Sequence, residues 1–269
     1  MTERPAVSLW PSTDKRAEYR WTGEPIADDR LRALALGAYV DRDAHYVDSI
    51  RRDCLHHPSD PTGCAAAALS DSWGITSAVD LRRTVARLLD GMHTAEYEEV
   101  YPLAEKAGAA VRDGRQLPAP HSRDDHRRFL AVRETVLGRT PGSLLTAYEA
   151  VYRLFAMNLV THLTADKYLP RHIRSWDLAR VPIVVRSAVT VGMIAEDEGW
   201  ELLSAALRRA QDEYHDWEMF SDGILAGRAY WLALGDIAEV EPEEKRLSRV
   251  IHDLFEAPSS PWRRVSLHP

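Results

Sequence analysis

Apolar residues recur at steps of three and four along most of this sequence, and that period constrains the fold more than any other feature. In one segment the apolar residues with this spacing are Trp200, Leu203, Leu207, Ala210 and Tyr214. Such spacing places side chains on one face of an α-helix. No run alternates with a period of two, and β-branched clusters are rare outside VPIVV (181–185). The sequence therefore predicts an all-α fold, a compact multi-helix domain.

Turn-forming residues predict an arm, a helical domain and a tail. Residues 1–26 contain three prolines and a glycine and predict an irregular N-terminal arm, with Trp10 and Trp21 expected to pin it to the body. Residues 27–236 carry the helical pattern. Residues 237–269 predict a surface segment, one short helix and a loose C-terminal tail.

The clearest linker within the helical domain is RQLPAPHS (115–122), with two prolines in eight residues. It divides the domain into the predicted halves 27–114 and 123–236, which we expect to pack together. No internal repeat with solenoid spacing is present.

Two late helices are predicted by their caps and their apolar faces. One runs from Ser143 to about Thr164 and places His162 on its apolar face. The other runs from Ser175 to Gly192, and Pro182 lies inside it. Because proline lacks a backbone N–H, we expect this helix to bend at Pro182.

The overall charge disfavours two classes of partner. The formal net charge is −7, whereas proteins that bind nucleic acid or anionic membranes carry a basic surface. No stretch approaches the roughly 18 apolar residues that a membrane span needs. We therefore expect no nucleic-acid partner and no membrane partner.

The cysteine content bears on the compartment. Cys54 and Cys64 are the two cysteines of the chain, too few for a disulfide framework. The first residues, MTERPAVSLWPSTDKR, have no apolar core of the kind found in secretory signals. Both features predict a protein of the reducing cytoplasm.

An arginine lies on an apolar helical stripe near the end of the predicted domain. In YHDWEMFSDGILAGRAYW (214–231), the residues Trp217, Ile224, Arg228 and Trp231 follow at steps of seven, four and three. These steps place all four on one face of a helix. A guanidinium in such a setting needs a carboxylate partner, because a buried unpaired charge costs several kcal/mol.

The expected partner of Arg228 is Asp177 or Glu218, with indole rings stacking on the guanidinium. Trp176 and Asp177 lie four and three residues before Arg180 on one predicted helix. The favoured interpretation is a structural ion-pair network between two helices. The alternative is a pocket in which Arg180 and Arg228 bind a small anionic ligand, because arginine suits carboxylate and phosphate groups.

Other candidate sites have simpler interpretations. Aspartate precedes histidine by three residues in Asp53/His56, Asp90/His93 and Asp212/His215. A di-metal site would also need glutamates from other helices, and CLHHPSDPTGC has no familiar zinc spacing. His162 with Asp166 is best explained as a core histidine bonded to a carboxylate. We expect no metal and no cofactor.

Several of these residues resemble a known family. The segments SWDLARVPIVVRSAVTVGMIAEDEGWELL and YHDWEMFSDGILAGRAYW are similar to the bacterial family called domain of unknown function 1266, as is DSWGITSAVDLRRTVARLLDG upstream. The residues that match its pattern in the two later segments are Trp176, Asp177, Arg180, Gly192, Glu198, Trp200, Tyr214, Trp217, Gly227, Arg228 and Trp231.

The resemblance covers roughly residues 70–93 and 172–233. Two positions depart from the family pattern: Met92 separates Gly91 from His93, and Asp216 replaces a serine. The family has no established activity, so the resemblance implies a fold and no function.

Two functions remain open. Nucleophile elbows, Walker loops, dinucleotide-binding turns and His-Glu-x-x-His are absent from the sequence, which lowers the case for hydrolase, nucleotide-binding or zincin chemistry. The favoured hypothesis is a non-catalytic interaction module that binds another protein, as an adaptor or a neutralising partner. The alternative is an enzyme or small-molecule binder that uses the Arg180/Arg228 pocket.

Overall fold

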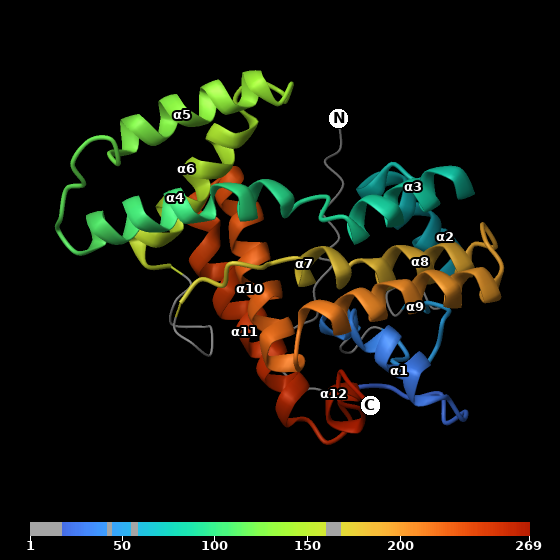
Figure 1. Ribbon diagram of the computed structural model, residues 1–269. Helices are drawn as coiled ribbons and strands as arrows, with labels where there is room; N and C mark the ends of the chain where they lie inside the picture. Colours follow the sequence, from blue (N-terminus) through green and yellow to red (C-terminus); the bar gives the residue numbers. More distant parts are fainter. Residues whose placement is uncertain (1–17, 42–44, 55–58, 160–167) are drawn as a thin grey trace, which may run out of the picture. The chain divides into compact units, whose positions relative to one another are not determined.

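The structure is a computed structural model, and it describes residues 18–41, 45–54, 59–159 and 168–269. In these ranges the regular structure is helical (Figure 1), and the one β-bridge joins Arg20 to Tyr46. The α-helices are α1 (Asp28–Ala35), α2 (Pro61–Ala67), α3 (Ala78–Leu89), α4 (Ala95–Arg112), α5 (Arg123–Val136), α6 (Ser143–Met157), α7 (Ser175–Leu178), α8 (Val181–Thr190), α9 (Glu196–Glu213), α10 (Trp217–Leu234), α11 (Val240–Glu256) and α12 (Pro261–Arg264). The predicted all-α fold is confirmed for the described residues.

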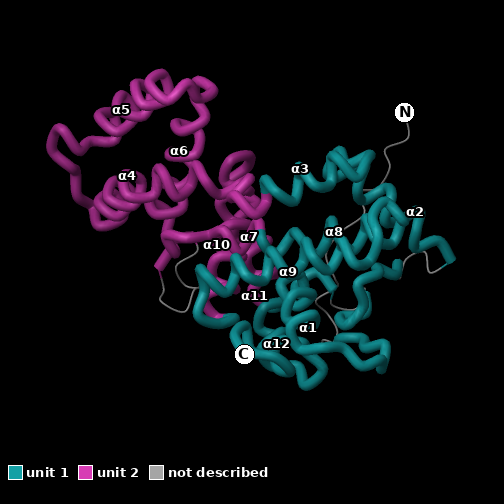
Figure 2. The backbone as a smooth tube through the Cα atoms, turned by 45° about the vertical axis from the view of Figure 1, so that its right-hand side comes forward, with its two compact units in different colours: residues 1–87, 178–217, 249–269 teal, residues 88–177, 218–248 magenta. Residues whose placement is uncertain are grey.

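The chain forms two units, and each unit is built from segments that are distant in sequence (Figure 2). The first unit comprises residues 1–87, 178–217 and 249–269, and the second comprises residues 88–177 and 218–248. The linker predicted at 115–122 lies inside the second unit, between α4 and α5. Contacts between distant segments define the units, and local composition does not reveal such contacts.

In the first unit, α8 and α9 pack closely because α9 offers a glycine at the crossing. A Cβ atom at Gly199 would lie 2.7 Å from Cγ2 of Val189 on α8. The segment after α11 also packs against the first unit. Trp262 stacks on Trp217 with ring centroids 4.9 Å apart, and its Nε1 donates to the carbonyl of Ala35 at 2.9 Å.

In the second unit, α4 packs against α6 (Figure 1), and a cluster of aromatic rings contributes to the core. Tyr97 of α4 meets Tyr230 of α10 edge to face at 5.2 Å, and Tyr101 meets Phe155 of α6 at 5.4 Å. The two helices approach closely at Gly108, where a Cβ atom would lie 2.4 Å from that of Phe155. All four rings are at least 95% buried, so they form much of this core.

The predicted helix from Ser175 to Gly192 is wrong in one respect. The chain forms α7, passes through a turn at residues 179–180, and begins α8 at Val181. Pro182 therefore occupies the first turn of α8, where a missing backbone N–H breaks no hydrogen bond. A break replaces the expected bend.

The predicted C-terminal tail is also wrong. Residues 240–256 form the long helix α11, and Trp262 and Leu267 beyond it are buried. Pro242 lies in the first turn of this helix, where proline is tolerated.

Two further expectations lie partly outside the described residues. Trp21 does hold the arm, since its Nε1 donates to the carbonyl of Ser259 at 2.8 Å, whereas Trp10 lies outside the described part of the chain. The helix α6 ends at Met157, and His162 and Asp166 lie outside the description.

Candidate functional site

Arg228 of α10 lies between two indole rings and beside a carboxylate. Its guanidinium carbon is 4.9 Å from the ring centroid of Trp231 and 5.8 Å from that of Trp176. Its Nη2 lies 3.0 Å from Oε1 of Glu243, and both side chains are about 85% buried. These contacts combine a charge pair with ring stacking in a partly desolvated site, which strengthens both interactions.

The carboxylate partner is not one of the two that the sequence suggested. Glu218 is exposed, and the guanidinium binds Glu243 from the first turns of α11. Arg246 donates two further hydrogen bonds to Glu243, each of 2.8 Å. Burial alone would raise the pKa of Glu243, but Arg246 first and Arg228 second hold that pKa below its ordinary value. The sequence analysis missed Glu243 because residues 237–269 were expected to form a surface segment, one short helix and a tail.

Asp177 was expected to pair with Arg228, but it binds other residues. It is fully buried, and its carboxylate accepts hydrogen bonds from the backbone N–H of His93 at 2.9 Å and from the hydroxyl of Thr94 at 3.1 Å. Nδ1 of His93 lies 2.6 Å from the same group. Asp177 therefore holds the residues that precede α4.

Arg180 and Trp217 belong to the first unit, whereas Arg228 belongs to the second. The guanidinium of Arg180 lies 5.5 Å from the ring of Trp73. Trp217 stacks on Trp262. A shared anion pocket of Arg180 and Arg228 therefore stays a prediction.

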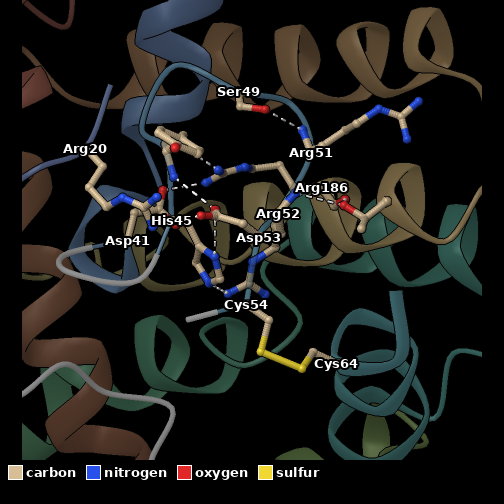
Figure 3. Close-up of polar contacts among 12 residues, drawn as sticks. Arg20, Asp41, His45, Ser49, Arg51, Arg52, Asp53, Cys54, Cys64 and Arg186 are labelled. Atoms are coloured by element: carbon tan, nitrogen blue, oxygen red, sulfur yellow. Dashed lines mark hydrogen bonds and ion pairs between the residues drawn. A yellow bond between two sulfur atoms is a disulfide. The ribbon is translucent and has the colours of Figure 1, made fainter. Parts of the chain in front are cut away.

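The first unit contains a buried charge network that the sequence analysis missed (Figure 3). Arg186 of α8 and Asp41 are 1% and 2% exposed, and Nη1 of Arg186 lies 2.5 Å from Oδ2 of Asp41. Nη2 of Arg186 donates to the carbonyl of Tyr46 at 2.6 Å. The pair therefore joins α8 to the chain that follows α1.

His45 lies between a guanidinium and a carboxylate in this network (Figure 3). Nη2 of Arg52 lies 2.6 Å from Nε2 of His45, and Nδ1 of His45 lies 3.5 Å from Oδ1 of Asp53. Because a guanidinium can only donate, Nε2 must accept, and the imidazole is neutral with its proton on Nδ1. Burial lowers the pKa of His45 below its ordinary value of 6.5, Asp53 opposes this shift and Arg52 adds to it.

An aspartate–histidine pair of this kind can orient a general base. Here the nitrogen that would take a proton, Nε2 of His45, is already occupied by Arg52. In this arrangement His45 cannot accept a proton from a third group unless Arg52 moves.

Asp53 joins the network to the N-terminal arm. Its carboxylate accepts from Nη1 of Arg20 at 3.0 Å and from the backbone N–H of Tyr46 at 3.2 Å. Burial alone would raise the pKa of Asp53, but the nearby His45 first, and the backbone N–H of Tyr46 after it, hold that pKa below its ordinary value. Asp53 is therefore ionised at neutral pH and contacts two other segments of the chain, at Arg20 and at residues 45–46.

The residue after Asp53 is a cysteine in a disulfide bond. Cys54 and Cys64 are joined, with their Cα atoms 6.4 Å apart. The sequence analysis expected reduced thiols, because two cysteines are too few for a framework. One bridge needs only two cysteines, and α2 brings Cys64 to Cys54.

A signal for the missed network was present in the sequence. Arg186 stands in the apolar run VPIVVRSAVT, just as Arg228 stands on an apolar stripe. The same reasoning that selected Arg228 would have selected Arg186. Its partner Asp41 is 145 residues away in sequence and has no such signal.

The described residues hold no group of three or more histidine, cysteine or acidic side chains that could bind a metal. His93 contacts Asp177, and Asp212 and His215 are both exposed. His56 lies outside the described ranges. In the same ranges, no helix is long and apolar enough to cross a membrane.

Helix α5 presents a second kind of candidate surface. Four large apolar side chains at its outer face and its end are 49–77% exposed, and we call them the α5 stripe: Phe129, Val132, Val136 and Leu137. Contiguous exposed apolar groups of this kind are typical of interaction sites.

Fold and site together define an all-helical protein whose buried arginines bind carboxylates from distant segments. The chain belongs to the family described as "Protein of unknown function (DUF1266)", which matches residues 68–267. The resemblance found in the sequence is thereby confirmed.

A curated relative is the uncharacterized protein YbeR of Escherichia coli strain K12, which is 28% identical over 181 residues. The alignment covers 66% of this chain and 64% of YbeR, so the chain aligns with less than two thirds of that relative. No solved structure matches the chain.

Proposed function

We propose that this protein is a non-catalytic protein-interaction module and that the α5 stripe is one of its contact surfaces. The observation that carries the proposal is the exposure of Phe129, Val132 and Val136, at 53%, 64% and 77%, on one helix. A second protein as partner and a cytoplasmic setting, both expected from the sequence, belong to this proposal.

The stripe lies on a different face from the one that α5 buries. His126, Leu130 and Glu134 follow at steps of four and are buried, whereas Phe129 and Val132 point away from that face. Apolar residues are therefore presented on a helix whose own core contacts are already made. That arrangement suits docking into a groove or against another helix.

The helix is held firmly before any partner binds. Glu134 accepts from the backbone N–H groups of Gly142 and Leu144 at 2.7 and 2.6 Å, so it caps the beginning of α6. Ser122 and Asp125 form a capping box at the start of α5. A preformed surface loses less conformational entropy on binding.

The size of the stripe limits what it can do alone. Stable interfaces bury about 800 Å² on each partner, and a fully buried aromatic side chain contributes about 150–250 Å². The α5 stripe is therefore the apolar centre of a wider contact or the whole of a weak one.

The alternative function, anion binding by Arg180 and Arg228, has less support. Glu243 already supplies a carboxylate to the Arg228 guanidinium. An anionic ligand there would have to displace this charge pair, which costs free energy.

The test compares the wild-type chain with a variant carrying Phe129→Ser, Val132→Ser and Val136→Ser. We expect tagged wild-type protein to retain a partner on purification from its native cells and the triple variant to lose it. Val79→Ser on α3, where the side chain is 60% exposed, is the matched control and should behave as wild type. Circular dichroism checks that the triple variant folds.

Two outcomes would reject the proposal. In one, the wild-type chain purifies alone and light scattering shows a monomer at all concentrations. In the other, the folded triple variant keeps the same partner with unchanged affinity.

A further inference from the structure

We propose that Cys54 and Cys64 form a reversible thiol–disulfide site that exchanges with low-molecular-weight thiols such as glutathione, and that its oxidation state is coupled to the charge network on Asp53. The proposal concerns the first unit and does not depend on a partner protein. The chain has two cysteines, and they are joined in a disulfide. The proposal gives this bond a role.

Both cysteines are placed for exchange. Both residues are partly exposed, and exchange requires access of a small thiol to the bond. Ten positions separate them in sequence, and α2 with its cap holds Cys64 opposite Cys54: Asp60 accepts from the N–H of Gly63 at 2.8 Å. This step rests on the cytoplasmic setting proposed above, where disulfides are usually transient, catalytic or redox-sensing.

The covalent bond and the network share one segment of backbone. Cys54 directly follows Asp53, which binds Arg20 and the N–H of Tyr46 and faces His45 (Figure 3). When the bond is closed, this segment is fixed to α2, and Asp53 is held within reach of its partners. When the bond opens, the network loses that tether.

Coupling of this kind must act in both directions. If the disulfide favours the assembled network, then the assembled network favours the disulfide by the same factor. A variant that weakens the network should therefore make the disulfide easier to reduce.

Oxidation of the two cysteines by oxidised glutathione takes place in two steps. One cysteine loses its proton, and its thiolate attacks a sulfur of oxidised glutathione, so the glutathione S–S bond breaks and one glutathione leaves as a thiolate that takes up a proton. The other cysteine thiolate then attacks the protein sulfur of this mixed disulfide and releases the second glutathione. The protein loses two electrons and two protons, and oxidised glutathione gains them.

The test equilibrates the full chain with graded ratios of reduced to oxidised glutathione, blocks free thiols with a maleimide and counts them by intact mass. We expect the wild type to pass from dithiol to disulfide within the range. Asp53→Asn and Arg20→Gln should each shift the midpoint at least about fivefold towards the dithiol. Asp113→Asn, which removes an exposed ion pair with Arg115 in the second unit, should not shift it.

A site that stays disulfide in the most reducing mixture, or stays dithiol in the most oxidising one, overturns the reversible exchange. A midpoint unchanged in the network variants overturns the coupling. Arg20 is about one third exposed, so Arg20→Gln decides the question if Asp53→Asn does not fold.

Discussion

Two buried arginines fix much of this structure, and each is balanced by a carboxylate from another segment of the chain. Arg186 binds Asp41, and Arg228 binds Glu243. The sequence can reveal the arginine, because a charge interrupts an apolar pattern. It cannot reveal the partner, because an exposed and a buried carboxylate look alike until the helices are placed. For this reason Asp177 and Glu218 were wrong as partners of Arg228.

Glu244 of α11 is a buried acid without such a partner. It is 1% exposed, and neither carboxylate oxygen has a hydrogen-bond partner among the described residues. Burial first, and the nearby charge of Glu241 second, raise its pKa from 4.5 to about 8. Glu244 is therefore protonated in the folded protein at neutral pH.

This raised pKa makes stability depend on pH. Below pH 4.5 the folded and unfolded chains both hold the proton, and Glu244 costs nothing. Between pH 4.5 and about 8 the folded chain binds more protons than the unfolded chain, so this group lowers the free energy of unfolding as the pH rises. Above that range its cost is constant.

We expect Glu244→Gln to raise the free energy of unfolding at pH 8 by about 2 kcal/mol or more and to have little effect at pH 4.5. Urea titrations at both pH values measure the difference. Glu239→Gln, at an exposed position just before α11, is the control and should change neither value. Equal effects of Glu244→Gln at the two pH values would contradict the raised pKa.

At the scale of helices, periodicity predicted most of the elements, and one error came from a proline. Apolar residues at steps of three and four indicated the apolar faces of α6, α9 and α10. Pro182 was expected to bend the helix around it, although it lies in the first turn of α8. A proline marks a helix start or a helix break according to its neighbours, and local spacing does not separate the two cases.

Close packing of Trp176 on α10 depends on a glycine. A Cβ atom at Gly227 would lie 2.3 Å from Cβ and 2.8 Å from Cγ of Trp176, closer than nonbonded carbon atoms approach. We expect Gly227→Ala to lower the free energy of unfolding by about 1–3 kcal/mol, because the indole must shift in a filled core. Thermal unfolding followed by circular dichroism measures the loss.

The matched control for this change is Gly235→Ala at the end of α10. A Cβ atom there meets its nearest neighbour, the carbonyl of Leu232, at 3.6 Å, so the methyl group fits. A loss of stability as large at Gly235 as at Gly227 would show that the effect comes from the backbone and not from Trp176.

At the scale of the whole chain, the division into units could not be predicted from the sequence. Proline content singled out residues 115–122, but the units interleave, and the first unit uses residues 249–269 as well as residues 1–87. The candidate site shows the same limit: Arg228 stood out on its apolar stripe, whereas the pairing of Arg186 with Asp41, 145 residues apart, depends on the tertiary fold.

Trp262 tests whether residues 249–269 are part of the first unit. The ring is 6% exposed, stacks on Trp217 and donates to Ala35. We expect Trp262→Ala to lower the free energy of unfolding by about 3–5 kcal/mol and to speed amide hydrogen exchange in α1. Trp231→Ala, which removes a ring that is 42% exposed, is the control and should cost clearly less. Unchanged exchange in α1 would contradict the assignment.

The interleaved units also set an order for events during synthesis. A ribosome adds about 5–20 residues each second and releases the chain from its first residue onward. The last segment of the second unit ends at residue 248, whereas the first unit also needs residues 249–269. Residues 18–87 therefore cannot complete their packing until Trp262 has been made. They remain accessible to chaperones and proteases for the longest time.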